Sequence, residues 1–136
     1  MLNRFVQNTD VHIFLTGKAG TGKTTFLRNL AANTYKRMVV VAPTGVAAIN
    51  AGGVTIHSFF QLPLCPYLPD VKELITEYQM PEKYRRPKKE RLKIFRTLDL
   101  LIIDEISMVR IDVFERIMQI LDFTATKGQN IRLIVV

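Results

Sequence analysis

Eight consecutive residues near the start of the chain have the types and the spacing needed to hold phosphate groups. Residues 17–24 (GKAGTGKT) match the pattern G-x-x-x-x-G-K-[ST] at every fixed position. Glycines let such a loop wrap closely around phosphates with its N–H groups pointing inward, and a following helix adds its positive N-terminal end. Lys23 is predicted to bridge the β- and γ-phosphates of a nucleoside triphosphate, and the Thr24 hydroxyl to ligate Mg²⁺. We therefore expect ATP and Mg²⁺ as cofactors, with nucleotide contacts from Gly17, Ala19, Gly20, Thr21, Gly22, Lys23, Thr24 and Thr25.

Two adjacent carboxylates end an apolar run later in the chain. Residues 100–103 are followed directly by Asp104 and Glu105. Ligands of open parallel sheets bind beyond the carboxyl ends of the strands, so this pair is expected to face the phosphate loop. Asp104 is placed to hold Mg²⁺, directly or through water, and Glu105 to orient or deprotonate the attacking water. Two acids after an apolar run can also simply favour a helix N-terminus. Together with the loop, they predict a hydrolytic site with Lys23, Asp104 and Glu105 as its catalytic residues.

The elements that position these residues alternate along the chain. Apolar runs predict strands over residues 11–16, 38–42, 98–103 and 131–136. Helical spacing predicts helices over residues 24–33, 46–51, 87–97 and 111–123, with a short candidate at 70–78. Strands that alternate with helices are typical of an α/β layered domain with a mostly parallel sheet. Residues 1–136 are thus predicted to form one domain, with an irregular proline-rich and basic insertion at about 61–91.

Composition and chain length narrow the class of protein. The chain has 136 residues, 48% hydrophobic and 23% charged, which is the balance of a soluble globular domain. No apolar run approaches the roughly 20 residues that span a bilayer, and residues 1–10 do not form a signal peptide. The single cysteine, Cys65, cannot form an internal disulfide, which fits a reducing compartment. An intracellular location is expected, in the cytoplasm with the nucleoid if the source is bacterial, with no membrane partner.

The net charge of +7 is concentrated in one segment. Residues 82–96 contain eight basic and two acidic residues, so they carry most of that charge. A basic segment of this kind fits a polyanion, with nucleic acid as the first candidate. A solvated helix face is an equally weighted alternative, because a charge run alone does not identify a partner.

The stretch after the second predicted strand resembles one family. Residues 41–48 (VAPTGVAA) and 53–60 (GVTIHSFF) resemble motif Ia and its extension in the PIF/RecD-like helicases. Residues 17–25 resemble motif I of this family and residues 104–109 (DEISMV) its motif II. These helicases belong to superfamily one and move 5′ to 3′ on single-stranded DNA. The resemblance covers most of residues 13–136. It implies the first RecA-like motor domain of an ATP-dependent DNA helicase, a P-loop NTPase with a three-layer sandwich.

The resemblance also implies where DNA would bind. A turn with free N–H groups and short hydroxyls can hold phosphates without reading bases. Phe59 or Phe60 can stack on a base, although a phenylalanine in an apolar context is more often part of the core. The histidine of this stretch has a structural role as its alternative. The implied DNA-contacting residues are Pro43, Thr44, Gly45, Thr55, His57, Ser58 and Phe60.

The family pattern also contains parts that these residues do not show. Its third motif, G-D-x-x-Q-L-P, is expected right after a strand like residues 131–136, and a second RecA-like domain completes the ATP site. The chain is therefore expected to be a first motor domain that lacks its second domain, binds ATP weakly and does not unwind DNA. Gln7 is a poor match to the adenine-contacting glutamine, which usually lies farther from motif I.

The resemblance further predicts the order of strands in the sheet. ATPases with a glutamate beside the motif II aspartate place one extra strand between the phosphate-loop strand and the motif II strand. Counted along the chain, the expected order is 2-3-4-1. The first strand would then be an exposed edge, which is an association hazard. The native protein is expected to be a monomer, and the fragment to self-associate through this edge.

Two other functions fit the same phosphate-binding motifs. An AAA-type ATPase, acting as a clamp loader or remodeller without strand translocation, would carry a sensor and arginine-finger pattern after the fourth strand. A nucleotide-binding module that no longer hydrolyses ATP is the other alternative, and Glu105 argues against it.

Overall fold

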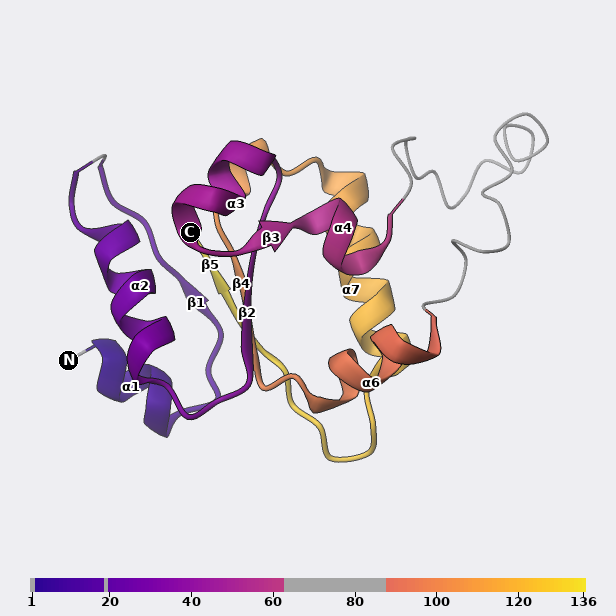
Figure 1. The fold of residues 1–136 in the computed structure, drawn as a ribbon. Coiled ribbons are helices and arrows are strands. Elements are labelled where there is room, and N and C mark those ends of the chain that lie inside the picture. Colours follow the sequence, from indigo (N-terminus) through magenta and orange to yellow (C-terminus); the bar gives the residue numbers. More distant parts are fainter. Residues whose placement is uncertain (1, 19, 63–87) are drawn as a thin grey trace.

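The computed structural model describes residues 2–18, 20–62 and 88–136 (Figure 1). Ala19, Cys65, the helix predicted at 70–78 and most of the predicted insertion lie outside these residues. The strands are β1 (Ile13–Phe14), β2 (Met38–Ala42), β3 (Val54–Thr55), β4 (Leu100–Ile103) and β5 (Arg132–Val135). The helices are α1 (Leu2–Asn8), α2 (Lys23–Asn33), α3 (Gly45–Ala51), α4 (Ile56–Phe60), α6 (Lys89–Thr97) and α7 (Ile111–Thr124), with a 3₁₀ turn at Ile106–Met108.

The five strands form one parallel sheet in the order β1-β5-β4-β2-β3. The predicted order of the four longer apolar runs is confirmed, since they follow one another as β2, β4, β5 and β1. The prediction omitted β3, which pairs with the end of β2 through Val41–Val54 and Ala42–Thr55. Two paired residues are too few to show a strand pattern in a sequence. All parallel strands end on the same side, so the segments that follow β1, β2, β3 and β4 begin there.

Helices cover both faces of the sheet, which makes the expected three layers (Figure 1). One apolar cluster joins α1, α2 and α3 to the sheet, and the other joins α4, α6 and α7 to its opposite face. Side chains along β4 alternate between the two clusters, and all four are buried. A strand buried on both faces explains why its sequence is continuously apolar.

The strand that precedes the phosphate loop is shorter than predicted. The backbone N–H of Leu133 in β5 donates to Nδ1 of His12 at 2.9 Å, so an imidazole replaces a strand carbonyl just before β1. Beyond the paired residues, the N–H of Leu15 donates to the carbonyl of Val135 at 2.8 Å. As predicted, β1 lies at an edge of the sheet, and Phe14 there is 66% exposed. Self-association through this edge stays a prediction.

Sequence patterns missed helix α1, which a buried arginine holds against the sheet. Arg132 of β5 is 1% exposed and its Nη1 donates to the carbonyls of Val6 and Thr9, both at 2.6 Å. Burial lowers the pKa of Arg132 from its ordinary value. Carbonyls at a helix C-terminus lack hydrogen-bond donors within the helix, and this guanidinium donates to them instead. Within the described ranges, no helix is long and apolar enough to cross a membrane.

Candidate nucleotide site and the neighbouring loops

The phosphate loop connects β1 to α2 and depends on glycine geometry. Gly20 and Gly22 have φ angles of +81° and +89°, a backbone region that residues other than glycine rarely adopt. Gly22 is also the N-cap of α2, so the first N–H groups of the helix open into the loop. A Cβ on Gly17 would lie 2.8 Å from the Thr21 hydroxyl oxygen, so a larger residue there requires the Thr21 side chain to move.

Side chains of the loop bind its own carbonyls. Lys23 Nζ donates to the carbonyl of Gly17 and, at 3.3 Å, to that of Lys18. The Thr21 hydroxyl donates to the same Lys18 carbonyl at 2.7 Å. The ammonium group therefore lies across the mouth of the loop, where it can donate to the oxygens of a ligand in place of these carbonyls.

The acidic pair follows β4 and faces the loop. The backbone N–H of Asp104 donates to the carbonyl of Val41 at 2.9 Å, which continues the pairing of β4 with β2. Its carboxylate Oδ1 accepts from the N–H of Glu105 at 2.9 Å. Glu105 has a φ of +54°, and the next N–H, of Ile106, bonds to the carbonyl of Val136 at 2.9 Å. The backbone thus turns sharply at Glu105, and its exposed side chain projects from the turn.

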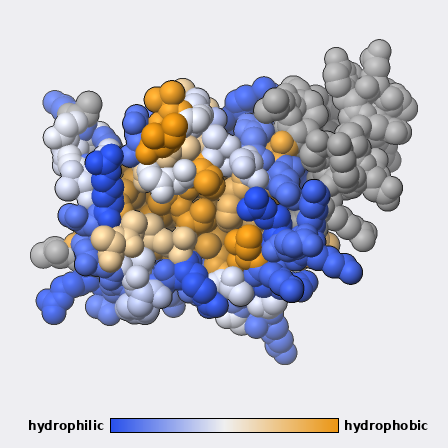
Figure 2. Space-filling view, viewed as in Figure 1, coloured by the Kyte–Doolittle hydropathy of each residue, from blue (hydrophilic) through white to orange (hydrophobic). Residues whose placement is uncertain are grey.

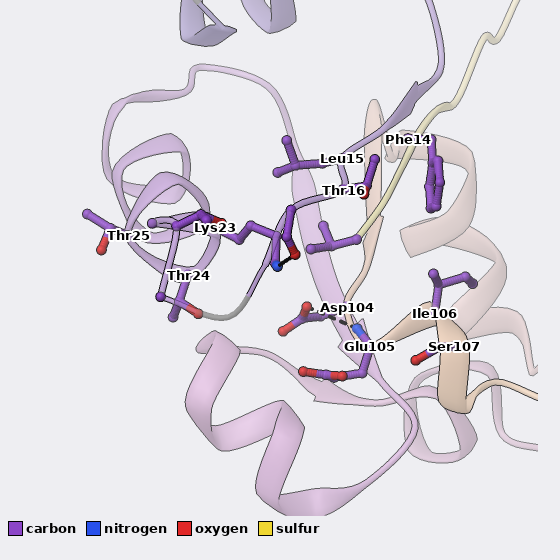
Figure 3. A pocket seen from close by; sticks show the side chains of 15 residues that line it. Phe14, Leu15, Thr16, Lys23, Thr24, Thr25, Asp104, Glu105, Ile106 and Ser107 are labelled. Atoms are coloured by element: carbon purple, nitrogen blue, oxygen red, sulfur yellow. Dashed lines mark hydrogen bonds between the residues drawn. The ribbon is translucent and has the colours of Figure 1, made fainter.

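One cavity brings the loop and the acidic pair together. It has a volume of about 730 Å³, and Figure 3 shows Lys23 and Thr24 on one side of it with Asp104 and Glu105 on the other. Every predicted nucleotide-site residue within the described part of the chain lines it. Six lining residues were not predicted; they are the neighbours at the strand ends, Phe14, Leu15, Thr16, Ile106, Ser107 and Val136. Most of these six residues could have been predicted from their position in the sequence next to the phosphate loop or the acidic pair.

The predicted DNA-contacting residues follow two neighbouring strands. Residues 43–45 link β2 to α3, Thr55 ends β3, and His57, Ser58 and Phe60 lie in α4. The pairing of Ala42 with Thr55 brings the turn at residues 43–45 next to the start of α4. Thr44 caps α3, and its hydroxyl oxygen accepts from the N–H of Ala47 at 3.2 Å. Thr55 caps α4 in the same way, accepting from the N–H of Ser58 at 3.2 Å. Of the remaining predicted residues, Gly45 and Ser58 are exposed, and Pro43 and His57 are half-buried.

The prediction that Phe60 contacts DNA is wrong. Phe60 is 2% exposed and stacks on Phe95 of α6, with ring centroids 5.4 Å apart. Phe59 is 5% exposed, packs edge-on against Phe60 and is covered by the guanidinium of Arg91 at 5.7 Å. Burying these rings in the core is more favourable than leaving them in water for a base to stack on.

Gln7 does not lie at the nucleotide end of the domain. Its side-chain oxygen accepts from the Thr34 hydroxyl at 3.4 Å, beyond the C-terminal end of α2. The phosphate loop is at the other end of that helix, about 15 Å away for a helix of this length. The weak match of Gln7 to an adenine-contacting glutamine therefore gains no support.

The described part of the basic segment lies on α6. Phe95 and Leu92 point inward as predicted, being buried and half-buried. Lys89, Lys93 and Arg96 are exposed, and Figure 2 shows hydrophilic surface over this helix. Both interpretations of the segment, a polyanion contact and a solvated face, stay open.

A phosphate loop lies between β1 and α2, and an acidic pair lies at the end of β4, which is separated from β1 by one strand in the same parallel sheet. This arrangement defines the domain as a P-loop NTPase. A family model described as PIF1-like helicase matches residues 1–130, and the chain belongs to that family.

Named relatives and solved structures agree with this family. The chain is 37% identical over 110 residues to the ATP-dependent DNA helicase Pif1 of Campylobacter jejuni, covering 78% of this chain and 24% of that protein. It is 37% identical over 121 residues to PIF1 of Saccharomyces cerevisiae, covering 85% and 13%. Bacteroides Pif1 bound to single-stranded DNA superimposes with a TM-score of 0.78 and 37% identity, covering 98% of this chain and 29% of that one. The chain thus spans less than a third of each of these relatives.

Proposed function

We propose that this chain binds Mg-ATP in the cavity and forms the first motor domain of a DNA helicase that moves 5′ to 3′ on single-stranded DNA. The observation that carries the proposal is the cavity that joins the phosphate loop to Asp104 and Glu105. Relatives named ATP-dependent DNA helicase support the reaction, and favour it over an AAA-type remodeller.

The residues of the loop act mainly by positioning and by charge. Backbone N–H groups at the start of α2 donate to phosphate oxygens, and Lys23 exchanges its carbonyl partners for β- and γ-phosphate oxygens. That exchange is favourable because a hydrogen bond between two charged groups is stronger than one to a neutral carbonyl. Glu105 has an exposed carboxylate in the cavity and orients or deprotonates the attacking water.

Thr24 and Asp104 suit Mg²⁺. One carboxylate oxygen of Asp104 is held by the N–H of Glu105, and the other accepts no hydrogen bond from the residues that the structure describes. Those residues contain no group of three or more acidic, histidine or cysteine side chains able to cage a metal. Mg²⁺ in phosphate sites uses one or two protein oxygens besides phosphates and water, so this sparse set fits it. When bound, the ion neutralises charge on the phosphates.

The turn after β2 and the start of α4 after β3 are suited to hold a DNA backbone. In each cap, the threonine oxygen accepts from a backbone N–H, which leaves the hydroxyl proton of Thr44 or Thr55 able to donate to a phosphate. Such contacts position a strand without reading its sequence. We propose Pro43, Gly45, His57 and Ser58 as neighbours of the same strand.

Nucleotide binding is tested with a fluorescent ATP analogue and Mg²⁺. Lys23→Ala is expected to weaken binding by about tenfold to a hundredfold, the loss of a charge-assisted contact. Lys18→Ala is the matched control, because it removes an exposed lysine of the same loop that occupies no fixed position of the pattern. Equal affinities of Lys23→Ala and the unaltered chain would refute the site.

Strand binding is tested at Thr55 with two substitutions of equal size. Aspartate and asparagine both cap helices well, so neither removes the start of α4. Thr55→Asp places a negative charge against phosphates and is expected to lower the affinity for an oligo-dT strand, whereas Thr55→Asn keeps it. If the two variants bind equally, Thr55 does not lie beside the strand.

Hydrolysis and unwinding are proposed for a protein that also contains the second RecA-like domain. The arginines that such a domain contributes are worth about a thousandfold or more in rate. We expect the 136-residue chain to bind nucleotide without unwinding DNA. Unwinding of a forked duplex by this chain alone would refute the two-domain requirement.

A further inference from the structure

A side-chain contact joins the phosphate-binding helix to the helix that follows the proposed DNA loop. Arg28 of α2 donates from Nη2 to the backbone carbonyl of Asn50 in α3 at 3.2 Å. Five residues before Arg28, α2 begins at the phosphate loop. The helix that contains Asn50 begins at Gly45, in the proposed DNA loop. The contact therefore connects two helices whose N-termini lie at the two proposed binding sites, one for nucleotide and one for DNA.

The two helices also pack against each other along the sheet. Leu27 and Leu30 of α2 share an apolar cluster with Ala51 of α3, and all three are buried. Interiors at native density transmit displacement rather than absorb it. A shift of α2 is therefore passed to the C-terminal end of α3.

The carbonyl of Asn50 needs a donor from outside its own helix. At the end of α3, Gly52 N–H bonds to the carbonyls of Ala48 and Ile49, and Gly53 N–H bonds to Ala48. The Arg28 guanidinium supplies the donor, and a cation at a helix C-terminus also interacts favourably with the helix dipole. Arg28 belongs to none of the nucleotide or DNA motifs.

We propose that Arg28 is a positioning residue that couples nucleotide binding at the phosphate loop to strand binding at residues 43–45. The inference rests on the proposed function, because it requires both ligands. Phosphates that engage the N-terminus of α2 change its position, Arg28 carries that change to Asn50, and α3 carries it to Thr44. Coupling of this kind is reciprocal, so DNA tightens nucleotide binding by the same factor.

A second connection between the sites does not involve Arg28. The hydrogen bond from Asp104 N–H to the Val41 carbonyl joins the acidic pair to β2, two residues before Pro43. Removal of the Arg28 side chain is therefore expected to reduce the coupling without abolishing it.

The test measures the coupling factor directly. The affinity of the chain for a non-hydrolysable ATP analogue with Mg²⁺ is determined with and without saturating oligo-dT, and the affinity for oligo-dT with and without the analogue. The two ratios must agree for one coupled system. We expect the ratio to fall by about threefold or more in Arg28→Ala, against typical couplings of about 5- to 150-fold, while the affinity for nucleotide alone stays within about twofold.

Three variants separate coupling from charge and from stability. Arg28→Lys keeps a cation at the end of α3 and is expected to retain part of the coupling. Arg4→Gln removes an exposed arginine of α1 and is expected to retain all of it. Ile117→Val removes a methyl group from the apolar cluster on the opposite face of the sheet, so it loses stability without touching α2 or α3.

The outcomes distinguish this inference from the proposed function. A chain that binds neither analogue nor oligo-dT overturns the proposed function, and the coupling with it. A chain that binds both, with a ratio of one or with a ratio that Arg28→Ala leaves unchanged, overturns the role of Arg28 alone. A fall in the ratio that Ile117→Val reproduces assigns the effect to lost stability and overturns the role as well.

Discussion

Gly53 lies so close to β2 that even a methyl group cannot be added without moving a strand. A Cβ at this position would lie 2.7 Å from the carbonyl carbon of Val40 and 2.9 Å from its Cβ. Carbon atoms pack at about 3.5–4.0 Å, so Gly53→Ala requires a displacement of about 1 Å. Val40 cannot yield easily, because its strand is paired on its other side with Ile102 of β4. The strain must therefore displace β3.

The loss of stability expected for Gly53→Ala follows from overpacking against a fixed backbone. Inserted methyl groups in packed sites cost about 1–3 kcal/mol, and a clash with a paired strand belongs at the upper end, about 3 kcal/mol. For a chain of this size that lowers the melting temperature by about 12 °C, at roughly 4 °C per kcal/mol. Gly52→Ala is the comparison: Gly52 has a φ of +71° but open space around its Cβ position. Gly52→Ala is therefore expected to lose stability only through the left-handed backbone, by about 1 kcal/mol.

Thermal unfolding followed by circular dichroism measures both variants. The expected order of stability is the unaltered chain, then Gly52→Ala, then Gly53→Ala. Because β3 positions Thr55, Gly53→Ala is also expected to weaken oligo-dT binding at temperatures where the variant is folded. A Gly53→Ala variant as stable as Gly52→Ala would refute the close approach of β3 to β2.

Two further results are expected. Phe60→Ala is expected to cost about 3–5 kcal/mol in urea unfolding, because Phe60 is a core residue, and a small loss would contradict its burial. The hydrogen bond from Arg37 to the Asp99 side chain holds the pKa of that carboxyl below its ordinary value of 3.8. The pair therefore stabilises the fold above that value and the effect is lost as pH falls through the lower folded pKa. Asp99→Asn is expected to reduce stability at pH 7 and to make the loss of stability in acid smaller. Urea midpoints that match the unaltered chain both at pH 7 and in acid would refute this.

The longer elements and the nucleotide site were predictable because their signals are local. The run at 38–42 matches β2 at both ends, and α7 buries Ile117 and Ile120 of the predicted face. The phosphate loop and the acidic pair each consist of consecutive residues, and the parallel sheet brings the two motifs together. Their fixed positions follow from chemistry, so no long-range information was needed to find them.

The features that were missed depend on contacts between distant parts of the chain. Helix α1 is short, and Arg132, far away in sequence, binds its terminal carbonyls. The shortening of β1 results from His12 binding the backbone of β5. Phe60 was assigned to DNA because the family resemblance placed its motif beside the strand, but the ring of Phe95 determines its place. No periodicity in a sequence encodes such pairings.

The backbone at Glu105 bears strain that its neighbours do not. It is one of two described non-glycine residues with a positive φ, the other being Gln61 beyond the end of α4. A left-handed conformation costs such a residue about 1–2 kcal/mol, and residues held this way cluster at functional sites. Glycine would adopt the same turn without that cost, although it also raises the entropy of the unfolded chain. If the strain persists because the carboxylate is needed in the cavity, stability and hydrolysis should respond in opposite directions.

Glu105→Gly and Glu105→Gln separate the two effects. Glutamine keeps the side-chain length and the strained turn, so the free energy of unfolding should stay within about 0.5 kcal/mol of the original. Glycine relieves the turn, and Glu105→Gly should be more stable than Glu105→Gln by about 1 kcal/mol. Neither variant can activate water, so both should bind the ATP analogue yet fail to hydrolyse ATP in a protein that has both RecA-like domains. A glycine variant less stable than the glutamine variant would contradict the strain, and hydrolysis that survives in Glu105→Gln would contradict the role of the carboxylate.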